Sequence, residues 1–201
     1  MSSDYTYPVD PTVAASAGLT PSQTVGPFFH TALPYEAGPQ VAGAARPGVV
    51  TLAGRVLDGA GAPVPDALVE IWQAGERGSF VDVPGVYREV SATGFRGFGR
   101  CPTDESGGYR FRTVKPGAVP TVDGTAQAPH VAMSVFARGM LRRAVTRVYF
   151  PDEANDADPL LAGLPEDRRG TLVAAADEDG YRFDVHLQGD QETVFLDVFA
   201  R

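Results

Sequence analysis

Residues 49–57 read VVTLAGRVL and residues 67–72 read ALVEIW, with Asp58-Gly59 and Gly61-Ala62-Pro63 between them. Both runs are rich in β-branched and apolar side chains, and the second alternates in and out, as a strand with one buried face does. Gly and Pro directly after an apolar run favour a tight turn. This stretch therefore predicts a strand, a turn and a second strand, and it decides the fold class.

The same signals recur along the rest of the chain. Gly and Pro, 23 and 17 of the 201 residues, fall between short apolar runs rather than in one linker. One helix-like stretch covers residues 165–176, but Gly170 interrupts it, so we expect a short helix and allow a strand at 171–175. Further strands are predicted at 108–113, 130–137, 144–150, 181–188 and 192–199, the last two joined as a hairpin at Gly189-Asp190. The expected fold is all-β, a β-sandwich of mostly antiparallel strands with long loops and one short helix.

The length of the chain suits a single domain with one sizeable core. We expect residues 20–201 to form that domain, and the small, polar residues 1–19 to be a mobile arm or to lie against a partner. Two loop regions, 73–100 and 116–129, are long for a compact β domain. Long loops of this kind tend to carry function, so we expect any site to lie there.

Composition excludes several classes of function. With 17 Lys and Arg against 25 Asp and Glu, the net charge is −8, and no basic patch is visible, so neither nucleic acid nor an anionic membrane is expected as a partner. A single cysteine, Cys101, forms no internal disulfide and suits a reducing compartment. Residues 1–20 lack the pattern of a signal peptide, and no apolar run is long enough to span a membrane. We therefore expect a cytoplasmic protein.

The chain offers few candidates for chemistry. Of its three histidines, His186 lies in a polar strand face, and His30 is expected as a hydrogen-bonded surface residue. His130 opens a strand after a loop and could project into a cavity, but no metal-binding partner stands beside it in sequence. We interpret Cys101 as a buried, inert thiol, and no serine elbow or phosphate loop is present. The residues alone predict a binding protein and no reaction.

Several short motifs carry a more specific signal, because they follow one another in a fixed order. They are TPSQTVGPF at 20–28, VEIWQ at 69–73, FGRC at 98–101, FRTVKPG at 111–117, APH at 128–130, VYF at 148–150 and YRFD at 181–184. In order and spacing this set resembles the intradiol ring-cleavage dioxygenases over nearly the whole chain.

The resemblance implies a fold and an activity. Such enzymes have a β-sandwich core and use a non-haem ferric iron to split the ring of 3,4-dihydroxybenzoate between its hydroxyls, in aerobic aromatic catabolism by the β-ketoadipate route. The product is 3-carboxy-cis,cis-muconate. Members of this kind are built from two homologous subunits, α and β, and the TPSQTVGPF start and the SVFARG run at 134–139 are similar to the α subunit.

The resemblance also implies where a metal would bind. The family holds its iron with two Tyr and two His, and the first of each falls on Tyr87 and His130. The second Tyr falls on Val119 and the second His on Ala132, neither of which has a donor atom, and a family Arg falls on Gln127. The resemblance thus implies no metal and no catalytic residue in this chain alone. The Fe(III) would be held by a homologous β subunit, in a hetero-oligomer that takes a small aromatic substrate and O2.

An α chain of this kind still contributes to a pocket at the α/β interface. The matching positions are Thr24, Gly26 and Pro27 in an early loop, with Phe28 beside it, and Arg138. A Gly-Pro turn permits close backbone approach to a ligand, and an Arg attracts a benzoate carboxylate. For Arg138, an interface salt bridge remains open as the alternative to substrate contact.

Two other interpretations are kept for comparison. The stretch 54–72 also looks like the small β-sandwich modules of carboxypeptidase regulatory domains, which would make the chain a non-catalytic structural or binding module. A standalone intradiol dioxygenase with relocated ligands is the second, and a tyrosinate-coloured ferric centre in the isolated chain would support it.

Overall fold

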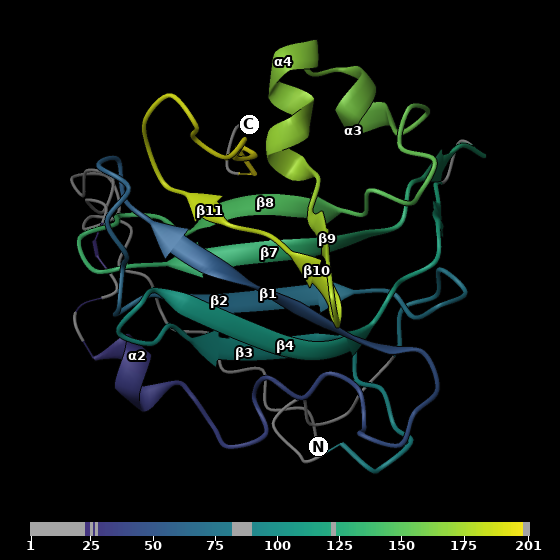
Figure 1. The fold of residues 1–201 in the computed structure, drawn as a ribbon, viewed down its shortest axis with the longest axis horizontal. Helices are drawn as coiled ribbons and strands as arrows, with labels where there is room; N and C mark the ends of the chain where they lie inside the picture. Colours follow the sequence, from purple (N-terminus) through teal and green to yellow (C-terminus); the bar gives the residue numbers. More distant parts are fainter. Residues whose placement is uncertain (1–22, 25, 27, 82–89, 122–123, 199–201) are drawn as a thin grey trace, which may run out of the picture.

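Two β-sheets packed face to face form the body of the molecule (Figure 1). The computed structural model describes residues 23–24, 26, 28–81, 90–121 and 124–198. Its strands are β1 (Val49–Leu57), β2 (Leu68–Gln73), β3 (Phe98–Pro102), β4 (Gly108–Val114), β5 (Val119–Pro120), β6 (Ala126–Gln127), β7 (His130–Phe136), β8 (Ala144–Tyr149), β9 (Ala175–Asp177), β10 (Gly180–Arg182) and β11 (Val185–His186). The expected all-β sandwich is confirmed.

The first sheet is built around β1. Antiparallel β4 runs along one edge of β1, and both β10 and β11 pair with the other edge in parallel. The strand predicted at 181–188 is split into β10 and β11. At the break, the backbone N of Arg55 donates a hydrogen bond to the side-chain Oδ1 of Asp184, at 2.9 Å, instead of to a backbone carbonyl. The backbone N of Phe183 still donates to the carbonyl of Ala53 at 2.8 Å. The strand therefore kinks without leaving β1.

The kink brings the backbone of Phe183 unusually close to Gly54. A Cβ atom added at Gly54 would lie 1.7 Å from the carbonyl oxygen of Phe183. No side chain fits in that space, so the glycine in the run VVTLAGRVL is required by packing rather than by a turn.

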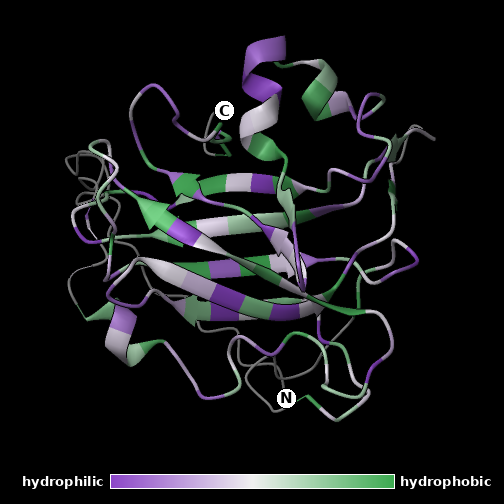
Figure 2. Ribbon diagram, in the orientation of Figure 1, coloured by the Kyte–Doolittle hydropathy of each residue, from purple (hydrophilic) through white to green (hydrophobic). Residues whose placement is uncertain are grey.

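The second sheet has the strand order β3-β2-β7-β8, all antiparallel. Apolar side chains of both sheets meet in one core, with Leu52 and Phe111 on one side and Ile71, Val131 and Met133 on the other. Along the strands hydrophobic and hydrophilic residues alternate (Figure 2), as expected when one face of each sheet is buried and the other faces outward.

Three sequence-based expectations are corrected. Residues 192–197 form no strand, because their backbone contacts are scattered: Thr193 pairs with His186 through its backbone N and its Oγ1 at 2.9 and 3.0 Å, and Leu196 donates to the carbonyl of Val145 at 2.7 Å. The short strand expected within 171–175 is replaced by a 3-10 turn at Gly170–Leu172, and β9 starts at Ala175. The described residues contain three short α-helices rather than one: α2 (Phe29–Ala32), α3 (Pro159–Ala162) and α4 (Glu166–Arg169).

Helices α3 and α4 lie together beside β8 (Figure 1), and Leu161 and Leu172 pack there with Tyr149 in a second, smaller core. In the part of the chain that the structure describes, no helix is long and apolar enough to cross a membrane. The arm expected at residues 1–19 lies outside the described residues.

Candidate functional site

His130 lies on the outward face of the second sheet, at the start of β7. Its neighbours Val131 and Met133 point into the core, so His130 and Ala132 point the other way. The Nδ1 of His130 lies 2.8 Å from the carbonyl oxygen of Ala128, and its ring centre lies 5.7 Å from that of Tyr149. Burial lowers the pKa of His130, so the imidazole is neutral at pH 7. Donation from Nδ1 leaves the lone pair on Nε2.

Tyr149 is fixed by a buried carboxylate. The hydroxyl of Tyr149 donates to Oδ1 of Asp158 at 3.0 Å, and the backbone N of Ala128 donates to Oδ2 at 2.9 Å. Asp158 also caps α3, accepting from the backbone N of Leu160 and Leu161. Burial raises the pKa of Tyr149 to about 12, so its hydroxyl stays protonated. One carboxylate thus joins β8, α3 and the segment leading into β7.

Arg147 completes this part of the sheet. It lies two residues before Tyr149 on β8 and directly opposite Ala132 on β7. Its Nη1 lies 3.4 Å from the hydroxyl of Tyr149. Burial is the main cause of the lowered pKa of His130, and the positive charge of Arg147 lowers that pKa further. We call His130, Ala132, Arg147 and Tyr149 the β7–β8 quartet.

The short ribbon of β5 and β6 carries two more positions singled out by the sequence. Val119 and Gln127 lie directly opposite each other across it. A cavity of about 590 Å³ opens beside the ribbon and reaches Ala128 and Asp158. Lys115 borders this cavity but is held by Asp152 at 2.8 Å and by Glu153, which raise its pKa against the opposing effect of burial. Of the charged groups that line the cavity, Lys115, Glu153 and Asp158 already have partners.

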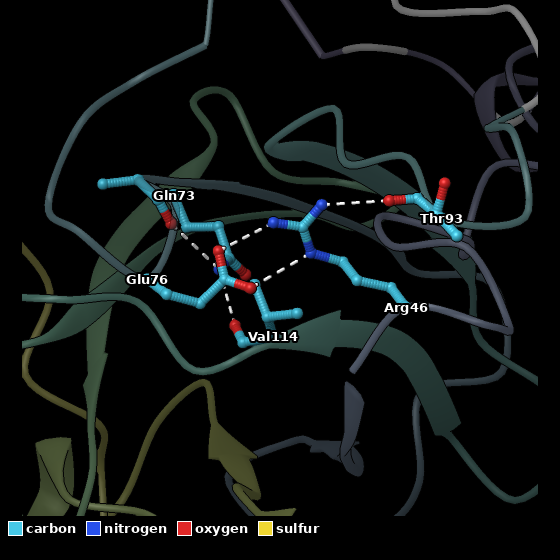
Figure 3. A network of polar contacts seen from close by, with 6 residues as sticks. Arg46, Gln73, Glu76, Thr93 and Val114 are labelled. Atoms are coloured by element: carbon cyan, nitrogen blue, oxygen red, sulfur yellow. Dashed lines mark hydrogen bonds and ion pairs between the residues drawn. The ribbon is translucent and has the colours of Figure 1, made fainter. Parts of the chain in front are cut away.

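A polar network fixes both ends of the long segment between β2 and β3 (Figure 3). Arg46 donates two hydrogen bonds to the carboxylate of Glu76, at 3.0 and 2.9 Å, and one to the carbonyl of Thr93 at 3.0 Å. The buried side chain of Gln73 donates to the carbonyl of Val114 at 2.8 Å and accepts from Thr113 at 2.7 Å. These contacts anchor the segment in which the sequence places Tyr87, although Tyr87 itself lies outside the described residues.

The residues expected at an interface pocket form two groups. In the first, the backbone N of Gly26 donates to the Oγ1 of Thr24 at 3.3 Å, and the side chain of Phe28 is 77% exposed; Pro27 lies outside the described residues. In the second, Arg138 lies just beyond the end of β7, with its side chain 70% exposed and its Nε 3.2 Å from Asp66. Among the described residues no hydrogen bond or ion pair joins the two groups.

The described residues do not fit a ferric ion at the positions that the resemblance indicates. Val119 and Ala132 supply no donor atom, and Arg147 places a cation opposite Ala132. Nor do the described ranges contain any group of three or more His, Cys, Asp or Glu side chains that could hold a metal ion.

Comparison with known proteins agrees with this geometry. A family model described as "Dioxygenase" matches residues 25–189. A solved structure, the dioxygenase domain of a carbohydrate-binding fusion protein from Streptomyces sp. SirexAA-E, is 25% identical with a TM-score of 0.55, and the match covers 85% of this chain and 98% of that one. The chain therefore belongs to the intradiol dioxygenase family, whose members use Fe(III).

Relatives in sequence indicate which members of the family the chain resembles. The alpha chains of protocatechuate 3,4-dioxygenase from Burkholderia cepacia and Pseudomonas putida are 43% and 41% identical to it. Each match covers 89% of this chain, and 97% and 96% of the respective relative. The beta chain from Burkholderia cepacia is 39% identical over 72% of this chain and 66% of its own length.

Sequence reasoning missed Arg147 and Asp158. Arg147 alternates with Tyr149 along a strand and therefore looks like an ordinary outward residue, and only the register of β7 with β8 reveals its position. Asp158 stands before Pro159, a pattern typical of a helix N-cap, which could have indicated α3.

Proposed function

We propose that this chain is the α subunit of a protocatechuate 3,4-dioxygenase and works only together with a homologous β subunit that holds the Fe(III). The reaction is intradiol cleavage of 3,4-dihydroxybenzoate by O2 to 3-carboxy-cis,cis-muconate. The observation that carries the proposal is the match to two α chains over 96% or more of their length. The missing donor atoms at Val119 and Ala132 support the assignment of the iron to the partner.

In this proposal the chain contributes binding and positioning rather than bond cleavage. One wall of the pocket shared with the β subunit is assigned to the early loop, at Thr24, Gly26, Pro27 and Phe28. Arg138 faces the carboxylate of the substrate: its side chain is largely exposed, and among the described residues its guanidinium pairs with Asp66 through Nε alone. The proposed compartment is the cytoplasm, where the single thiol of Cys101 stays reduced.

The first test compares the chain alone with the chain co-expressed with a candidate β subunit. We expect iron, and O2 uptake that depends on 3,4-dihydroxybenzoate, only in the co-expressed sample. Ferric iron and turnover in the lone chain would overturn the proposal and favour a standalone enzyme with relocated ligands.

A second test separates substrate contact by Arg138 from a structural ion pair. In the assembled enzyme, Arg138→Ala is expected to raise KM for 3,4-dihydroxybenzoate about tenfold with little change in kcat, because a charge-assisted contact to the carboxylate is lost. Asp66→Ala is the matched control, since it removes the same ion pair but keeps the guanidinium. An unchanged KM in Arg138→Ala would exclude substrate contact.

A further inference from the structure

The β7–β8 quartet holds a positive charge where the family places a metal. Residues 130 and 132 lie on one face of β7, so donor atoms at these positions would converge on a point above that face. Directly opposite Ala132 on β8 lies Arg147, and side chains paired in this way stand about 5 Å apart at their Cβ atoms. The guanidinium therefore borders the space in which a metal bound through positions 130 and 132 would lie.

That charge has no direct counter-ion among the described residues. Within the described ranges no carboxylate forms an ion pair with Arg147, and its hydrogen bond to Tyr149 is a long one, at 3.4 Å. Asp158 lies nearby and its negative charge acts against that of Arg147, but its carboxylate binds Tyr149 and three backbone N–H groups and does not contact the guanidinium. The side chain of Arg147 is half-buried, so solvent and salt screen it less than a surface charge.

The charge of Arg147 also acts on the neighbouring imidazole of His130. Burial is the largest cause of the lowered pKa of His130, and Arg147 acts in the same direction by disfavouring a second positive charge on the imidazole. The hydrogen bond to Ala128 and the negative charge of Asp158 raise that pKa in part. A metal cation bound to the same imidazole would meet the same repulsion, multiplied by its higher charge.

We propose that Arg147 excludes metal from this chain, because its positive guanidinium lies next to the place beside His130 where a metal ion would bind. Restoring the lost donor atoms is then not sufficient to restore metal binding. This inference deepens the proposed function, because it concerns why iron goes to the partner. On this inference, electrostatic repulsion by Arg147 acts against a metal ion in addition to the loss of ligands. Binding sites commonly use such repulsion to reject an unwanted ligand.

The test uses Zn²⁺ and needs no activity. Ala132→His completes a His-x-His pair with His130, a pattern that binds divalent metals. We compare this variant with the double variants that add Arg147→Gln or Arg147→Lys, and measure the Zn²⁺ dissociation constant of each by calorimetry. Arg147→Gln is expected to tighten binding at least tenfold, whereas Arg147→Lys keeps the charge and leaves binding within about twofold.

A matched control removes a positive charge elsewhere. The side chain of Arg110 is exposed on the other sheet and has no partner among the described residues, so Arg110→Gln changes net charge by the same amount. Equal Zn²⁺ affinity with and without Arg147→Gln, or an equal gain from Arg110→Gln or Arg147→Lys, would overturn the inference. If thermal melting shows that Ala132→His does not fold, the smaller donor Ala132→Cys replaces it in the same comparison.

A second measurement addresses iron itself. Val119→Tyr and Ala132→His are combined, with Arg147 kept or changed to Gln, and Fe(III) per chain is determined after desalting, together with the visible absorbance of iron tyrosinate. More iron is expected only with Arg147→Gln. The proposed function is tested separately, by oxygen uptake of the heteromer that contains the unaltered chain. A failure of metal exclusion by Arg147 would therefore not be mistaken for a failure of the proposed function.

Discussion

At the scale of single residues, Gly54 shows how a strand can depend on a missing side chain. We predict that Gly54→Ala destabilises the protein by at least about 3 kcal/mol, because its Cβ would overlap a backbone carbonyl that cannot move without breaking β10 from β1. The measurement is urea denaturation followed by circular dichroism. Gly170→Ala is the control, since nothing lies near the added Cβ and the backbone is helical there. Equal losses in both variants would contradict this account.

Cys101 gives a second residue-scale prediction. Its thiol is buried, and burial raises its pKa, so the reactive thiolate is scarcer than in an exposed cysteine at the same pH. Reaction of the native chain with an aromatic disulfide reagent at pH 8 should be at least tenfold slower than reaction of the urea-unfolded chain. The rate should keep rising above pH 9, where an exposed thiol would level off. Equal rates in native and unfolded protein would show that the thiol is accessible.

At the scale of elements, Asp158 decides whether α3 stays docked. We predict that Asp158→Ala costs about 3 kcal/mol, because it removes a helix cap and leaves the buried hydroxyl of Tyr149 and the backbone N of Ala128 without partners. Thermal and urea unfolding measure the loss. Asp156→Ala, an exposed neighbour without such contacts, should change stability by less than about 0.5 kcal/mol. A similar effect of both variants would argue against the cap.

The strands were predicted well where periodicity and turn residues agree. The strand at 49–57 has the expected bounds, and those that begin at Gly108, His130 and Ala144 are correct to within one residue. β3 was missed because Gly99 and Pro102 are residues typical of a loop. In the strand, Gly99 is required because a Cβ atom at this position would clash with the side chain of Val41. The described part of the stretch, 192–198, has strand-like residues but makes only scattered hydrogen bonds to its neighbours, and no local pattern reveals that a regular ladder does not form.

The candidate site was less accessible to sequence reasoning. His130 was singled out by its place after a loop, but Val119 and Ala132 gained meaning only from the family resemblance, because an absent donor leaves no pattern of its own. The juxtaposition of Ala132 and Arg147 depends on the register of two strands, which a one-residue slip would abolish. The interface residues from Thr24 to Phe28, and Arg138, stay predictions.

At the scale of the whole molecule, the described part of this acidic chain exposes several large apolar side chains, and Phe28 is the most exposed of them. On the proposed function Phe28 lies against the β subunit. We predict that Phe28→Ser weakens αβ assembly at least tenfold, measured by analytical ultracentrifugation, and leaves the melting temperature of the lone chain unchanged, because an exposed side chain contributes little to its core. Phe28→Leu should restore most of the affinity. Undiminished assembly of Phe28→Ser would place the interface elsewhere.

The pairing of β1 with β10 and β11 also determines the order in which the chain can fold. Arg55 and Asp184 are 129 residues apart, so one edge of β1 gains its partners only after residues 180–186 have left the ribosome. The second sheet is complete in sequence by Tyr149 and can form earlier. Contacts between distant residues slow folding and leave an open strand edge exposed meanwhile. During synthesis, this edge of β1 is therefore open to wrong pairing until β10 and β11 arrive.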